Sequence, residues 1–210
     1  MLLALADANC CFTVIDIGAE GRRSDGGIFQ NSNLRHQLEN NHFKLPKARL
    51  ISKDGPALPY IIVADEAFAL AAYMLRPYPR SNLNIKKRVF NYRLSRVRRV
   101  IECAFGILTS RWRIYERPIA TNVKNAMLIV QATTCLHNFL MKRDLNLPVE
   151  RRSYSVNNSD NRTSSKALCS FGNSKNEVFR GSTVRDEFAQ YFYTHGAVKQ
   201  QWIKIQTNDF

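Results

Sequence analysis

Residues 60–65 read Tyr-Ile-Ile-Val-Ala-Asp, an apolar and largely β-branched run that ends at a carboxylate. A run that is apolar on both faces is typical of a central strand in a covered sheet. We expect the residues after Asp65 to form a helix to about Leu75, because Pro77 and Pro79 would then close it. A buried strand that leads into a helix predicts an α/β fold.

The first residues of the chain predict a β-hairpin. Residues 1–6 and 11–18 form two short strand-like runs, and a turn-forming stretch, residues 7–9, separates them. Because the chain begins inside a strand, with no residues leading into it, we expect it to be a fragment of a larger domain.

A helix is predicted after the hairpin. Ser24 or Asp25 can cap it, and its apolar residues extend through positions 28–38. Residues 41–59 contain three prolines and are expected to form a loop.

Two long helices are expected downstream. The first covers about residues 85–115, and Gly106 within it indicates either close packing or a break. The second covers about residues 123–142 and is almost wholly apolar over 126–140, so we expect it to be buried. One apolar stripe, spaced by three or four residues, follows the first helix at Phe90, Leu94, Val97, Ile101, Phe105, Leu108 and Trp112.

The composition changes after the second long helix. We therefore divide the chain into a partial nuclease-like domain over residues 1–147, a disordered linker over 148–182 and a C-terminal helical tail over 183–210. The linker is rich in Ser, Asn, Lys and Arg. The helix of the tail is expected to begin at Thr183 with a capping box and to end near Gly196.

Charge is the most unusual property of the sequence. The formal net charge is +14 and the pI is near 9.9, which favours a polyanionic partner such as nucleic acid. Residues 76–117 hold twelve Lys and Arg against two Glu, and mutual repulsion would be relieved by phosphates. The other interpretation is a solvated helix face. Candidate nucleic-acid contacts are Lys86, Lys87, Arg88, Arg93, Arg96, Arg98, Arg99, Arg111 and Arg113.

The five cysteines do not have the spacing of a zinc site, and their odd number argues against a disulfide framework. Cys103 and Cys135 fall in apolar helical patterns, where a free cysteine is usually a small core residue. No apolar run is long enough to span a bilayer. We expect an intracellular protein with reduced thiols.

Two carboxylates stand out as candidate metal ligands. Asp65 follows the buried strand, where open α/β sheets build their sites, although Asp there can also cap a helix. Glu102 lies at the edge of the apolar stripe, where it can face a cleft or pair with Arg98 or Arg99. Oxygen ligands suit Mg²⁺ or Mn²⁺.

Several stretches, in their order and spacing, resemble Harbinger-type transposases and their domesticated nuclease relatives. The resemblance covers about residues 1–142, and residues 184–188 resemble the C-terminal tail of the family. The matching stretches are residues 14–18, 21–29, 62–68, 98–108, 111–113 and 136–139.

The resemblance implies a ribonuclease H-like mixed sheet with flanking helices and an Asp, Asp, Glu triad that holds Mg²⁺ or Mn²⁺. Asp65 matches the second carboxylate and Glu102 the third. The first belongs to an Asp-Gly-x-His motif on a strand that is missing here, so the first catalytic strand is absent. Asp25 either caps its helix or lies beside the metal site, and His137 is expected to be a core residue.

These observations favour a transposase-derived DNA endonuclease domain that depends on a divalent metal and is impaired by the missing Asp. The resemblance also implies DNA as substrate, a Myb-like DNA-binding partner protein, and a nuclear location, with some protein in the cytoplasm. The alternatives are a non-catalytic basic module that binds DNA or a partner, and a decayed transposon product.

Overall fold

The structure is a computed structural model that describes residues 1–19, 24–43, 45–51, 55–154 and 180–207. The chain divides into two compact units, the first formed by Met1–Arg23 and Arg99–Ser164 and the second by Ser24–Arg98 and Ser165–Phe210. Most of the expected linker lies outside the described residues. Within the described part, no helix is long and apolar enough to cross a membrane.

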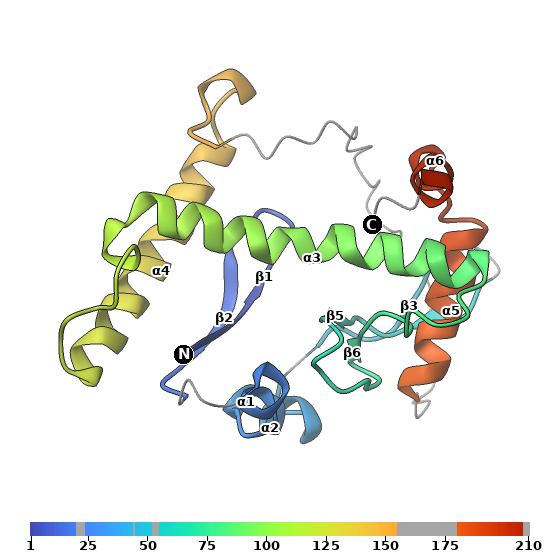
Figure 1. Ribbon diagram of the computed structural model, residues 1–210, viewed down its shortest axis with the longest axis horizontal. Helices are drawn as coiled ribbons and strands as arrows, with labels where there is room; N and C mark the ends of the chain where they lie inside the picture. The colour runs from blue at the N-terminus through green and yellow to red at the C-terminus, as the bar shows by residue number, and fades with distance from the viewer. Residues whose placement is uncertain (20–23, 44, 52–54, 155–179, 208–210) are drawn as a thin grey trace. The chain divides into compact units, whose positions relative to one another are not determined.

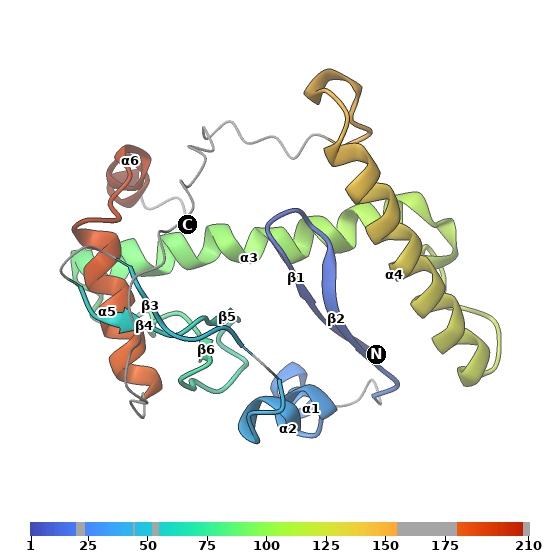
Figure 2. The same cartoon turned by 180° about the vertical axis from the view of Figure 1, so that it is seen from behind.

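The first unit begins with the predicted hairpin, which is confirmed. Strand β1 (Leu2–Ala6) pairs antiparallel with β2 (Phe12–Ile17), as both views show (Figures 1 and 2). Asp7 fixes the turn, because its Oδ1 accepts hydrogen bonds from the backbone N–H groups of Asn9 and Cys11 at 2.9 and 3.0 Å. The local chemistry of an Asx turn therefore sets the register of the pair.

Helix α4 (Val123–Leu145) supports this hairpin through polar side chains on one face. Asn122 caps α4. The amide of Asn138 bonds both the N–H and the C=O of Phe12, at 2.8 and 2.7 Å. His137 is fully buried, as expected of a core residue, and its Nε2 lies 2.7 Å from the Cys10 carbonyl oxygen. Three hydrogen bonds thus fix the hairpin end to the helix.

The opposite face of α4 is exposed, so the expectation of a buried helix is wrong. Leu128, Leu136 and Phe139 are more than half exposed. Cys135 on α4 and Cys103 on α3 (Ile85–Arg111) are also exposed, which corrects their assignment to the core. An apolar composition does not reveal which face of a helix has a partner.

Two short helices open the second unit. Helix α1 (Asp25–Gln30) and helix α2 (Asn33–Glu39) replace the single helix that was expected. Ser24 caps α1 by accepting a hydrogen bond from Gly27 N–H at 3.2 Å, so Asp25 is not the cap and lies in the first turn. Ser32 caps α2 and ends the first helix early.

The segment after Asp65 is not a helix, which corrects the prediction for residues 66–75. Strand β5 (Ile62–Val63) pairs parallel with β6 (Met74–Leu75), whose side chains are buried. Strands β3 (Arg49–Leu50) and β4 (Ala57–Leu58) form a second short ladder in the expected loop. Met74 and Leu75, at the end of the expected helix, are buried in this strand pair, whereas Ala67 and Ala69 are exposed.

Helix α3 contributes residues to both units and confirms the long predicted helix (Figure 1). Phe90, Leu94 and Leu108 of its stripe are buried, whereas Val97 is 53% exposed. A Cβ added at Gly106 would meet no atom within 4 Å, so neither close packing nor a break explains this glycine. A 3₁₀ turn, η1 (Arg113–Tyr115), follows α3, and a second, η2 (Val149–Arg151), follows α4.

The C-terminal part forms two helices. Helix α5 (Gly181–Tyr193) has no side-chain cap, so the predicted capping box at Thr183 is wrong. Helix α6 (Lys199–Thr207) was not predicted. Val184 and Ala189 of α5 are fully buried in a cluster with Phe90, so this tail is part of the core of the second unit.

The mixture of helices and small sheets fits the α/β class. The described strands form three separate two-stranded sheets, and the larger mixed sheet expected from the resemblance is not assembled from them.

Candidate metal and nucleic-acid site

Asp65 lies at the carboxyl end of β5, in the second unit. The strand pair holds it there, because Ala64 N–H bonds the Leu75 carbonyl oxygen at 2.9 Å. Its Oδ1 accepts a hydrogen bond from Ala67 N–H at 2.9 Å, and its Oδ2 lies 3.9 Å from Arg98 Nη2. The carboxylate therefore caps a turn, not a helix, and keeps an oxygen beside a guanidinium.

Close packing fixes the loop that carries Asp65. A Cβ added at Gly26 would overlap the Ala67 carbonyl oxygen, so only glycine permits this approach of α1. The rings of Phe29 and Phe68 meet edge to face with centroids 5.7 Å apart. Arg76 donates hydrogen bonds to the carbonyl oxygens of Glu66 and Phe68, both at 3.2 Å. Its guanidinium therefore stabilises this loop.

Glu102 lies on the exposed side of α3 and belongs to the first unit. Arg98, one of the two partners expected for it, lies 3.9 Å from the carboxylate of Asp65. The predicted convergence of Asp65 and Glu102 in space stays a prediction.

The described residues do not assemble a complete metal site. Among them, no group of three His, Cys, Asp or Glu side chains is placed to hold an ion. Asp25 is exposed in the first turn of α1. Asp65 has one oxygen engaged in its turn and the other beside a cation. Mg²⁺ is usually bound by one or two carboxylates together with several waters, so Asp65 and Glu102 could supply such ligands only if they converge.

Two of the candidate nucleic-acid residues are engaged inside the fold. Arg111 pairs with Asp144 at 3.1 Å, with side chains only 12% and 4% exposed. Arg93 donates to the Gly196 carbonyl oxygen at 3.2 Å and stacks on the Phe192 ring at 4.8 Å. Burial is the main reason that the pKa of Arg93 lies below its usual value.

Three candidates near the start of α3 also contact the C-terminal helices or the loop before α3. Arg88 donates to the Ile205 carbonyl oxygen, and Lys86 Nζ lies 3.5 Å from the Gln190 side-chain oxygen. Lys87 lies over the Tyr78 ring at 5.3 Å. Some of the positive charges in the basic segment therefore stabilise the packing of the C-terminal helices α5 and α6.

The remaining candidates lie closer to solvent. Arg96 stacks on the Tyr92 ring at 5.9 Å, and Arg98 is a third exposed. Arg99 is exposed. Arg113 is 86% exposed and pairs with Glu116 at 3.3 Å, a contact that contributes little stability in water.

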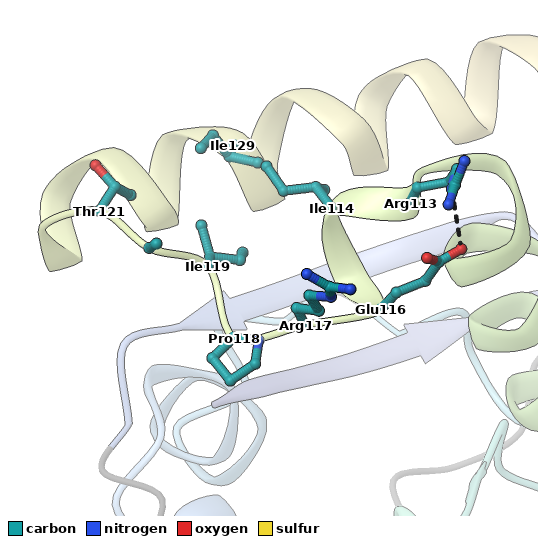
Figure 3. A pocket seen from close by; sticks show the side chains of 9 residues that line it. Arg113, Ile114, Glu116, Arg117, Pro118, Ile119, Thr121 and Ile129 are labelled. Atoms are coloured by element: carbon teal, nitrogen blue, oxygen red, sulfur yellow. Dashed lines mark hydrogen bonds and ion pairs between the residues drawn. The ribbon is translucent and has the colours of Figure 1, made fainter.

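A cavity of about 720 Å³ lies in the first unit (Figure 3). Ile119 of the loop and Ile129 of α4 line it together with Arg113 and Arg117. Arg117 was counted in the basic segment but not chosen as a candidate contact. The signal in the sequence was that Arg117 lies two residues beyond the predicted helix and directly before Pro118, where a loop is expected.

A buried cluster around Tyr78 was also missed. Its hydroxyl donates to Asp186, and Arg185 lies over its ring at 4.0 Å. Burial, followed by this carboxylate, raises the pKa of Tyr78 far above its usual value. The capping-box pattern that assigned Asp186 to its own helix concealed this role.

Comparison with known proteins identifies the family. A family model described as DDE superfamily endonuclease matches residues 1–138, and that superfamily is ribonuclease H-like. A curated relative, "Protein ALP1-like" from Arabidopsis thaliana, is 26% identical over 141 residues, which are 67% of this chain and 34% of the relative. The chain thus spans about a third of the length of that relative, and no solved structure matches it. The resemblance inferred from the sequence motifs is confirmed, and the chain belongs to the DDE superfamily of endonucleases.

Proposed function

We propose that this chain supplies two carboxylates, Asp65 and Glu102, to a metal-dependent DNA phosphodiester hydrolase of the DDE type. The observation that carries the proposal is the position of Asp65, at a strand end within the segment that the family model matches. The superfamily typically uses a divalent metal, and Mg²⁺ or Mn²⁺ would be the ion. Glu102 lies within the same matched segment.

The proposed activity of these 210 residues alone is weak. A divalent ion needs several oxygen ligands, and the described residues bring no third His, Cys, Asp or Glu to either carboxylate. Weak metal binding and little hydrolysis follow. The alternative function, a basic module that binds DNA without cutting it, is favoured by the same observation.

The proposed DNA contacts are the basic residues that the fold leaves nearest to solvent. Arg99 and Arg113 are exposed, and contacts from such residues to phosphates add affinity without sequence preference. Arg93 and Arg111 are assigned to the fold instead, because each is engaged within its own unit.

The test is binding to random-sequence duplex DNA across a salt series. Each neutralised phosphate contributes roughly 0.9 to the slope of log affinity against log salt. We expect a slope of several for the unmodified chain and a fall of about two in Arg99→Ala/Arg113→Ala. The matched control is Arg35→Ala, which removes a cation from α2, where Arg35 pairs with Glu39 at 2.8 Å. A slope near zero in the unmodified chain, or an equal fall in the control, refutes the proposed contacts.

We also propose a nuclear location and a Myb-like DNA-binding partner protein, both on the family resemblance. The described residues form no dedicated DNA-reading motif, so the partner protein would recognise the target sequence. Fluorescence microscopy of the tagged chain, with and without a co-expressed Myb-like protein, tests both. Exclusion from the nucleus in both conditions contradicts the proposal.

A further inference from the structure

Aromatic and aliphatic side chains lie exposed at the end of α5 and along α6. Tyr193 is 40% exposed, Trp202 37% and Ile203 62%. His195, Lys199 and Lys204 are exposed beside them in sequence. We call these six residues the aromatic patch. Figure 2 shows α5 and α6 joined by a short turn, so the patch lies within one helical hairpin.

The hairpin that carries the patch is held firmly. A Cβ added at Gly196 would overlap the Tyr191 ring, so the turn requires glycine. Gln201 is fully buried and its Nε2 donates to the Phe192 carbonyl oxygen at 3.0 Å. Arg93 of α3 bonds the Gly196 carbonyl oxygen and covers the Phe192 ring. The patch is therefore presented by a fixed scaffold, and little ordering remains to be done on binding.

The two rings of the patch leave an aromatic face available. Tyr193 and Trp202 meet in a T-shaped arrangement, with centroids 5.6 Å apart and planes at 75°. In such a pair one ring presents its edge, so its own faces are not covered by the partner. The group that packs best against an uncovered aromatic face is another flat, aromatic ring system.

Between Glu187 and Asp209, the charged side chains in the sequence have one sign. Residues 188–207 contain Lys199, Lys204 and His195 but no Asp or Glu. Like charge opposes contact between two copies of the patch, in a chain whose net charge is +14. A partner that brings both flat rings and negative charge fits the patch.

We propose that the aromatic patch binds single-stranded nucleic acid, with an unpaired base stacked on the Trp202–Tyr193 pair and an adjoining phosphate near Lys199, three residues before Trp202 on α6. Base stacking on aromatic side chains tolerates any sequence and is combined with cationic contacts to the backbone. This site is separate from Asp65 and from the arginines proposed to contact duplex DNA. It gives the chain a second activity, which is to hold unpaired strands.

Tryptophan fluorescence tests the proposal directly, because the chain has only two tryptophans, Trp112 and Trp202. We expect a dT oligonucleotide of about 20 residues to quench the emission. Trp202→Leu should abolish that quenching and weaken binding about tenfold, whereas Trp202→Phe, which keeps a ring, should retain most of the affinity. The matched control is Phe139→Ala, which removes an exposed aromatic side chain from α4 and should bind as the unmodified chain.

Three results would overturn the proposal. The first is equal oligonucleotide affinity in Trp202→Leu and Trp202→Phe. The second is equal quenching by poly-glutamate, which would reveal general electrostatic attraction. The third is concentration-dependent association in sedimentation that Trp202→Leu removes, which would identify the patch as an interface between copies. Duplex binding by the Trp202 variants should be unchanged, so failure here is distinguishable from failure of the duplex contacts proposed for Arg99 and Arg113.

Discussion

Arg111 and Arg113 are two residues apart, and the structure predicts that their ion pairs differ sharply in importance. Arg111 and Asp144 are mostly buried, whereas Arg113 and Glu116 are 86% and 56% exposed. Removing one partner of a buried pair leaves an uncompensated charge and costs about 3–5 kcal/mol. Removing one partner of an exposed pair costs less than about 1 kcal/mol.

The assay is urea unfolding followed by far-UV circular dichroism. With an m value of about 2 kcal/mol/M, a loss of about 4 kcal/mol lowers the midpoint by roughly 2 M. We therefore expect Asp144→Ala to lower the midpoint by this amount and Glu116→Ala, the matched control, to change it by less than roughly 0.5 M. Arg111→Met should leave the salt dependence of DNA binding unchanged in protein that remains folded.

Equal midpoints for Asp144→Ala and Glu116→Ala would refute this assignment of Arg111 to the fold. The same conclusion would follow if Arg111→Met, still folded, lowered the salt slope by roughly the 0.9 expected of a phosphate contact.

Three further predictions concern pH, glycine and catalysis. Burial, opposed by the hydrogen bond to Cys10 and aided by Arg111, lowers the pKa of His137. As the pH falls, the unfolded chain therefore takes up the proton before the folded chain does, so the stabilising contribution of neutral His137 is complete above about pH 6.5 and is lost in more acidic solution. Urea titrations should show this loss of stability in the unmodified chain but not in His137→Gln. Gly26→Ala should destabilise by about 1–3 kcal/mol through overlap with Ala67, whereas Gly106→Ala should stabilise by about 1 kcal/mol, and thermal melts that rank them otherwise would contradict the packing described. With Mn²⁺, plasmid nicking should be weak, and strong nicking that Glu102→Gln abolishes would mean that a third ligand is present.

Local chemistry explains which elements the sequence could predict. The hairpin followed from turn residues, among which Asp7 forms the bonds that such residues favour. Helix α3 followed from a long apolar period. The same reasoning failed for residues 66–75, because Met74 and Leu75 pair with β5 and because Gly26 and Gly181, from distant parts of the chain, pack closely against Ala67 and Ala71.

Charge and apolar content did not reveal how individual side chains are used. Nothing in the sequence distinguishes Arg93, which covers Phe192, from the exposed Arg99, since both lie in one basic helix. Apolar content pointed to the wrong face of α4, whose exposed residues include Leu128, Leu136 and Phe139, whereas its buried residues include Thr133, Thr134 and His137. Asp65 was placed correctly at a strand end, whereas its ion pair with Arg98 was not predicted.

Binding of Mn²⁺ tests the central claim, that Asp65 and Glu102 serve one metal site. Electron paramagnetic resonance counts free Mn²⁺ during a titration and needs no catalysis. We predict one weak site per chain that both Asp65→Asn and Glu102→Gln weaken, while Asp25→Asn, the matched control from the first turn of α1, leaves it unchanged. A site that responds to only one of the two carboxylates, or to neither, would contradict the claim.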